Sequence, residues 1–172
     1  MVILGIDPGL NATGFGVIRA EAGRYHVVNA GDIRPSPKQP LPDRLAVIHE
    51  GLSRLMKTYQ PEVAVLEQIF THQRFPTAAS LMAHARGVAC LAAQEEGIPL
   101  VQYMPTRIKR ALSGRGNATK EQVARMVEYW LGVREPAWSA DATDALALAI
   151  AHGHIIDLST RQAAMAHPSG RT

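Results

Sequence analysis

The chain has 172 residues, 47% of them hydrophobic, and a net charge of +3, which indicates one globular domain and excludes a disordered protein. Its most apolar stretches, residues 81–93 and 146–156, are interrupted by His or Arg, so neither predicts a membrane span, which needs about 20 apolar residues. A single cysteine, Cys90, excludes an internal disulfide and CxxC metal motifs. No basic region precedes the first apolar run, so we expect no signal peptide and a cytoplasmic protein.

The first part of the chain predicts three strands joined by short links. An apolar run over residues 2–6 ends at Asp7, and further strands are expected over residues 14–18 and 25–30. Links this short favour hairpins and antiparallel pairing. A proline-rich loop then leads into a helix whose apolar residues recur at helical spacing over residues 45–56.

The rest of the chain alternates strands and helices. Strands are expected over residues 63–66 and 99–103, and helices over residues 77–96, 106–112, 119–131 and 140–156. Such βαβ alternation adds parallel strands with helices on both faces of the sheet. We therefore predict one α/β domain over residues 1–158, with a mixed five-stranded sheet flanked by helices, and a flexible tail over residues 159–172.

Two acidic residues follow apolar strands, and two more share one face of the last helix. Asp7 and Glu67 emerge at the carboxyl ends of their strands, so their carboxylates would converge if those strands are neighbours. Asp141 and Asp144 are three residues apart and lie on one side of their helix. Four converging carboxylates would repel one another unless a cation neutralises them.

Carboxylate ligands without Cys or His favour a hard ion, Mg²⁺ or Mn²⁺, over zinc. Two such ions about 3.5–4 Å apart stabilise the attacking and leaving oxygens of phosphoryl displacement, so the joint arrangement predicts phosphodiester hydrolysis. Taken singly, each acid has an ordinary structural explanation. Asp7 belongs to a common turn motif, Glu67 flanks a strand, and Asp144 could be an exposed helix residue. Asp141 could favour a helix start after an N-cap at Ser139.

Basic residues, with no acidic residue among them, are concentrated between Arg107 and Lys120. They are Arg107, Lys109, Arg110, Arg115 and Lys120. A concentrated basic segment is expected where phosphates are neutralised. The alternative interpretation is a solvated helix face. Gly114 and Gly116 would let the loop between them approach a nucleic-acid backbone closely.

Several short motifs follow one another in a characteristic order. They are Gly5-Ile-Asp-Pro-Gly9, Leu66-Glu-Gln-Ile-Phe70, Ala85-Arg-Gly-Val-Ala89, the stretch from Lys109 to Lys120, and Asp141-Ala-Thr-Asp-Ala-Leu146. Together they resemble the RuvC family of bacterial Holliday-junction resolvases, over roughly residues 1–155. The resemblance implies an RNase H-like fold, a homodimer, and paired nicks at symmetric positions across a four-way DNA junction.

The resemblance also implies roles for individual residues. The four acids match the family's metal site, although some relatives carry His at the position of Asp141. Phe70 matches an aromatic residue that opens or stacks on junction bases, and core packing is its alternative interpretation. Lys109 and Lys120 match basic positions that face DNA. The RuvA and RuvB branch-migration proteins are implied as partners.

Local charge adds further candidates for DNA contact, namely Arg74, Arg107, Arg110 and Arg115. The Ala-rich helix over residues 77–93 is expected to cover the sheet, to face a dimer partner, or both. His152 and His154 are expected at the surface or at a helix cap.

Three other interpretations of function compete with a junction resolvase. A related RNase H-like nuclease acting on RNA would use the same acidic site. An ATPase of the actin and sugar-kinase type would need a second such domain, and the chain has no GxxxxGK[ST] loop. A catalytically silent junction-binding module would require all four acids to be incidental.

Overall fold

The computed structural model describes residues 1–68, 76–133 and 138–166, with the backbone alone for residues 76–79 and 161–166. Its strands are β1 (Val2–Asp7), β2 (Thr13–Glu21), β3 (Arg24–Ile33), β4 (Val63–Glu67) and β5 (Leu100–Tyr103). They form one sheet in the order β3-β2-β1-β4-β5. The first three strands pair antiparallel, and β4 and β5 continue the sheet in parallel. The predicted mixed five-stranded sheet is confirmed.

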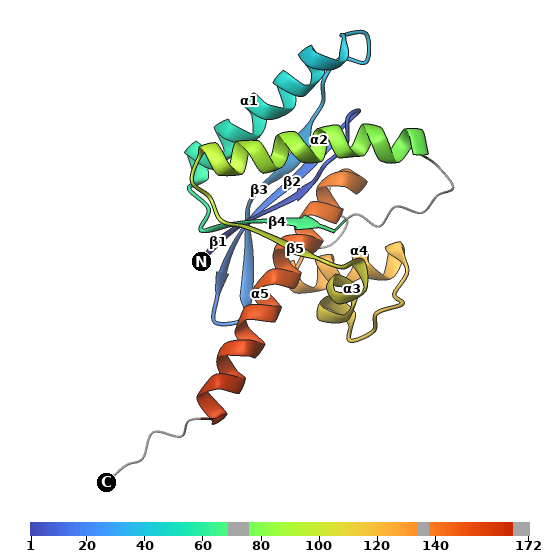
Figure 1. Ribbon diagram of the computed structural model, residues 1–172. Helices are drawn as coiled ribbons and strands as arrows, with labels where there is room; N and C mark the ends of the chain where they lie inside the picture. Colours follow the sequence, from blue (N-terminus) through green and yellow to red (C-terminus); the bar gives the residue numbers. More distant parts are fainter. Residues whose placement is uncertain (69–75, 134–137, 167–172) are drawn as a thin grey trace.

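Helices cover both faces of this sheet. They are α1 (Leu41–Tyr59), α2 (Pro76–Glu95), α3 (Pro105–Ser113), α4 (Lys120–Leu131) and α5 (Ala140–Ala166). Helices α1 and α2 lie on one face, and α5, with α3 and α4 beside it, lies on the other (Figure 1). Within the described ranges, no helix is long and apolar enough to cross a membrane.

Helix α5 is longer than the sequence pattern indicated. It continues to Ala166, past the predicted end at Ile156. Residues 157–166 contain neither Gly nor Pro, so nothing in them breaks a helix. The hydroxyl of Ser159 donates to the Ile155 carbonyl at 2.8 Å, which is compatible with a continuing helix. The predicted helix end at Ile156 was therefore wrong, because the sequence from there to Ala166 contains no helix-breaking residue.

The alternation of side chains along β1 and β4 decides which face carries their terminal acids. Ile3 packs in the core beneath α5, whereas Leu4 packs in the core beneath α1 and α2. Because alternate residues of a strand share a face, Asp7 lies on the same side as Ile3. Val65 of β4 also packs beneath α5, so Glu67 shares that side. Both acids therefore face α5.

Glycines in β1 and β2 let α5 lie unusually close to the sheet. A Cβ added at Gly5 would overlap the main-chain oxygen of Ala145, and one added at Gly14 would overlap that of Asp141. Gly14 is the register partner of Asp7. The missing side chains thus allow the first turn of α5 to rest directly beside the end of β1.

His152 is a core residue and not the surface or capping residue that was predicted. Its side chain is 4% exposed, and its Nδ1 lies 2.8 Å from the hydroxyl of Tyr103. Burial lowers the pKa of His152. His154 packs against the ring of Trp130, with centroids 4.2 Å apart. Tyr103 contacts the ring of His152 and Trp130 contacts that of His154, and both partners are distant in the sequence.

We expect Tyr103→Phe to reduce the free energy of unfolding by about 1–3 kcal/mol, because it leaves a buried nitrogen of His152 without its partner. The ring is retained, so the packing of the Arg107 guanidinium over it at 5.1 Å remains. Urea unfolding measures the change. Stability equal to that of the unmodified protein would show that the hydrogen bond contributes nothing.

Candidate active site

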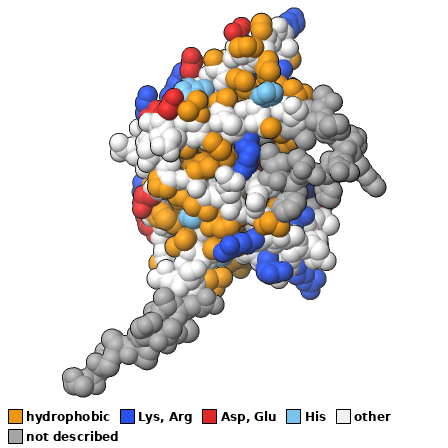
Figure 2. Space-filling view, in the orientation of Figure 1, with side chains coloured by type: hydrophobic (Ala, Val, Ile, Leu, Met, Phe, Trp, Pro, Cys, Tyr) orange, Lys and Arg blue, Asp and Glu red, His pale blue; other side chains and the backbone are white. Residues whose placement is uncertain are grey.

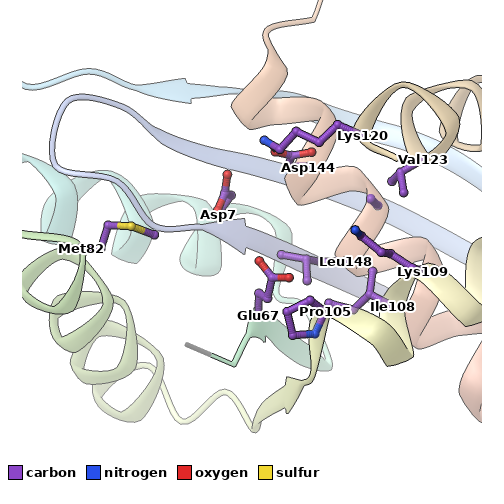
Figure 3. Close-up of a pocket in the computed structure, with 11 residues that line it drawn as sticks. Asp7, Glu67, Met82, Pro105, Ile108, Lys109, Lys120, Val123, Asp144 and Leu148 are labelled. Carbon is purple, nitrogen blue, oxygen red and sulfur yellow. The ribbon is translucent and has the colours of Figure 1, made fainter. Parts of the chain in front are cut away.

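Asp7 and Glu67 end neighbouring parallel strands. Ile6 and Leu66 are register partners, so the acids that follow them leave the sheet at the same edge. The expected adjacency of the two strands is confirmed. Both carboxylates and that of Asp144 line a hollow of about 250 Å³ (Figure 3).

The first turn of α5 brings the other two acids to this edge. Asp144 lines the hollow, and Asp141, one turn earlier, is close enough for its charge to act on Asp7. The hydroxyl of Ser139 accepts a hydrogen bond from the Ala142 amide at 3.0 Å, as an N-cap does. The same hydroxyl donates to Asp32 on β3 at 2.6 Å. The helix start is therefore tied to the sheet.

The environment of Asp7 disfavours its charged form. Burial, followed by the charges of Asp144, Asp141 and Glu67, raises the pKa of Asp7 from 3.8 to about 7. The charge of Lys120 opposes the rise. Apolar walls contribute to the burial, and they are Met82, Pro105, Ile108, Val123, Ala147 and Leu148.

Glu67 is affected in the same way. Burial and then the charge of Asp144 raise its pKa, and the charges of Lys109, Lys120 and Arg86 oppose the rise. Carboxylates crowded in a half-buried site with raised pKa values form a site that favours added positive charge.

Lys120 supplies part of that positive charge. Its Nζ lies 2.7 Å from Asp144 Oδ2, and this hydrogen bond is the main cause that raises the pKa of Lys120. A capping box at Thr119 fixes the start of α4. The main-chain amide of Gln122 donates to the Thr119 hydroxyl at 3.3 Å, and the side-chain oxygen of Gln122 accepts from the main-chain amide of Thr119 at 2.9 Å. Lys109, from α3, also lines the hollow (Figure 3).

No group of three or more acidic, histidine or cysteine side chains lies close enough to hold a metal ion within the parts of the chain that the structure describes. In this geometry Lys120 is the cation paired with Asp144. The chemistry of the donor set nevertheless fits a divalent ion, because the donors are all carboxylates, and burial followed by their mutual repulsion raises the pKa of Asp7. Lys120 is an exposed residue on a flexible stem, so the pair can separate.

We expect the metal-free protein to lose stability as the pH rises from about 4 to about 7. In this window the folded state keeps a proton on Asp7 that the unfolded chain, with a pKa of 3.8, has released. Removing the proton charges a half-buried carboxylate, and the loss is on the order of a few kcal/mol at most. The raised pKa of Glu67 acts in the same direction.

Urea unfolding in EDTA at about pH 4.5 and about pH 8 checks this. Asp7→Asn removes the titrating group and should flatten most of the dependence. An equally steep dependence in that variant would contradict the assignment.

Three further predicted DNA contacts lie on α3 and in the α3–α4 loop. Arg107 and Arg110 are exposed on α3. Arg115 lines a separate hollow with Arg125 of α4. Lys and Arg side chains gather at this end of the visible surface (Figure 2). Phe70 and Arg74 lie outside the described residues.

Sequence reasoning assigned no role to Arg86, although it lies within one of the motifs behind the family resemblance. Its Nη1 donates to the main-chain carbonyl of Glu67, and its Nη2 donates to Gln102 Oε1 at 2.6 Å. A hydrogen bond to a main-chain atom leaves no periodic signal in a sequence, so only the motif itself could have drawn attention to this residue.

Comparison with known proteins decides the family. The family model described as "Crossover junction endodeoxyribonuclease RuvC" matches residues 3–152. The chain belongs to the RuvC family. The protein of that name from Rhodopirellula baltica is 43% identical over 154 residues, which cover 90% of this chain and 86% of the relative. That from Tolumonas auensis is 40% identical over 171 residues, covering 99% and 96%.

Solved structures show the same fold. Thermus thermophilus RuvC superposes with a TM-score of 0.86 at 33% identity, covering 93% of this chain and 98% of that one. T. thermophilus RuvC in complex with Holliday junction substrate gives a TM-score of 0.86 at 34% identity, with 93% and 97% covered. The yeast mitochondrial resolvase Ydc2 shares the fold at 14% identity, with a TM-score of 0.62 and coverage of 92% and 80%. The RNase H-like α/β fold implied by the resemblance is confirmed.

Proposed function

We propose that this RuvC family member resolves four-way DNA junctions by paired symmetric nicks at the site formed by Asp7, Glu67, Asp141 and Asp144. The chain is a crossover junction endodeoxyribonuclease that acts in DNA recombination and repair. The observation that carries the site assignment is the convergence of strand-end and helix-start carboxylates at one hollow, with the pKa of Asp7 raised to about 7.

RuvC family nucleases depend on divalent metal, and we propose that the four carboxylates hold one or two ions, Mg²⁺ or Mn²⁺. Oxygen-only donors and an excess of negative charge support this choice. When bound, such ions supply the Lewis acidity for phosphodiester hydrolysis. The carboxylates of Asp7 and Glu67, on rigid strand ends, keep the donor positions fixed.

Lys109 and Lys120 flank the acids and are suited to bind the phosphates on either side of the cleaved bond. In this role Lys120, which now pairs with Asp144, would bind a DNA phosphate instead. The exchange would replace one charge-assisted hydrogen bond by another.

The basic surface around α3 is proposed to bind the arms of the junction. Arg107, Arg110 and Arg115 extend the positive charge away from the cleavage site, where they would contact the DNA backbone without reading its sequence. Phe70 is proposed to stack on junction bases, and Arg74 to contact the backbone.

A homodimer would match the twofold symmetry of a four-way junction and place one site at each of two strands. Exposed apolar residues on α2, namely Leu81 and Leu91, support the expectation that this helix packs against a second copy while its buried alanines cover the sheet. RuvA and RuvB are the proposed partners in branch migration. A cytoplasmic location suits a protein that acts on bacterial DNA.

Competition between substrates tests the proposed activity. A labelled four-way junction is cut in the presence of an excess of unlabelled linear duplex, RNA–DNA hybrid or four-way junction. We expect only the unlabelled junction to suppress cleavage strongly. Preferential suppression by the hybrid would move the chain to the RNA nucleases, and equal suppression by linear duplex would contradict selectivity for junctions.

A further inference from the structure

Glu67 lies where the pairing of β4 ends. Pairing between β4 and β1 ends at Leu66, which lies opposite Ile6. On the β5 side, the main-chain amide of Gln68 donates to the Tyr103 carbonyl at 2.8 Å. The main-chain carbonyl of Glu67 accepts instead from Arg86 Nη1 of α2. A strand-end carbonyl needs a partner when it is partly buried, and here that partner is a charged side chain.

The same guanidinium reaches the neighbouring strand. Its Nη2 donates to the side-chain oxygen of Gln102 at 2.6 Å, and Gln102 is the register partner of Leu66. The planar fork of arginine allows one side chain to hold two acceptors at a fixed spacing. Arg86 therefore clamps the ends of β4 and β5 to each other.

This clamp lies on the opposite side of the sheet from the acids. Arg86 comes from α2, which packs on one face, whereas the carboxylate of Glu67 points into the hollow on the α5 side (Figure 3). Arg86 thus holds the backbone of Glu67 without lining the site. Fixing the main chain of a strand-end residue restricts the directions that its side chain can take.

Helix α2 has a second polar tether that does not involve the site. Near its C-terminal end, Glu95 Oε2 lies 2.7 Å from His49 Nε2 of α1. If Arg86 only anchored α2, loss of either tether would have the same consequence. Loss of the Glu95 contact therefore tests the effect of anchoring α2 alone, whereas loss of the Arg86 contact also removes the hydrogen bond to Glu67.

We propose that Arg86 is a positioning residue that orients Glu67 as a metal ligand by binding its main-chain carbonyl from the α2 face. The inference rests on the proposed function, because the orientation of Glu67 matters only if its carboxylate holds an ion. Loss of such an outer partner typically reduces metal affinity or activity by about 10–100-fold.

The test compares Arg86→Gln, Arg86→Lys, Gln102→Ala and the control Glu95→Gln with the unmodified full-length protein. Calorimetry without DNA gives the Mn²⁺ affinity, and junction cleavage gives kcat and KM. We expect Arg86→Gln to weaken Mn²⁺ binding and to lower kcat by about 10–100-fold, with KM little changed. Arg86→Lys should recover part of the loss, Gln102→Ala should lose less, and Glu95→Gln should change neither quantity.

Mn²⁺ affinity in Arg86→Gln equal to that of the unmodified protein would overturn the inference while leaving the proposed function intact. An equal loss in Glu95→Gln would also overturn it, because the effect would then belong to α2 packing. If Arg86→Gln does not fold, the Gln102→Ala and Arg86→Lys series decides by the same criteria. An unmodified protein that neither binds Mn²⁺ nor cuts would overturn the proposed function itself and the inference with it.

Discussion

In the Asp7→Asn variant we expect cleavage of a four-way junction to fall by at least about a thousandfold, which corresponds to about 4 kcal/mol in the activation barrier. Asn keeps the shape of the side chain but removes the charge at the centre of the acidic group, where Asp144, Asp141 and Glu67 all act on it. Binding of the junction should persist, because removal of a negative charge next to phosphates does not weaken association. Single-turnover cleavage and gel-shift binding measure the two quantities.

The matched control is Asp43→Asn. Asp43 is an exposed residue in the first turn of α1, so this variant changes the net charge by the same amount without touching the site. We expect its cleavage rate to equal that of the unmodified protein. Cleavage by Asp7→Asn within about tenfold of the unmodified rate would be incompatible with Asp7 as a central ligand.

Gly14→Ala should damage both the fold and the site. The added Cβ would overlap the main-chain oxygen of Asp141, so α5 has to move away from the sheet. Overpacking of this kind costs about 1–3 kcal/mol of stability. A displacement of about 1 Å at a catalytic group can cost about a hundredfold in rate, and here it separates Asp141 and Asp144 from Asp7.

Gly87→Ala serves as the control for this substitution. Gly87 lies within α2, and a Cβ added there meets nothing within 4 Å in this chain, so we expect stabilisation of the fold by about 0.5–1 kcal/mol. Urea unfolding and kcat measured on both variants separate the effects. A Gly14→Ala protein with the stability and kcat of the unmodified chain would contradict close packing of α5 on β2.

The fold could be predicted because its signals are local. Short links between the first strands fix antiparallel hairpins, and alternation of strands with helices fixes the parallel extension of the sheet. The end of α5 could not be predicted in this way, since residues 157–166 mix polar and apolar side chains and contain no residue that marks a helix end. His152 was misplaced for a related reason: its partner, Tyr103, comes from a distant strand.

Part of the site could also be read from the sequence. Asp7 and Glu67 follow apolar runs, and neighbouring parallel strands bring such residues to one edge. The approach of α5 depends on Gly5 and Gly14, whose role is visible only once the helix is placed against them. The contact of Arg86 with a main-chain carbonyl has no counterpart in residue periodicity.

The most direct test of the central claim is cleavage of a synthetic four-way junction, labelled on each strand in turn, with and without Mg²⁺ or Mn²⁺. For a RuvC family member with this acidic site we expect paired nicks at symmetric positions that appear only when one of these ions is present and that vanish in Asp7→Asn. Tight junction binding without nicks under either ion, or nicks that persist in EDTA, would contradict the assignment of Asp7, Glu67, Asp141 and Asp144 as a metal-dependent nuclease site.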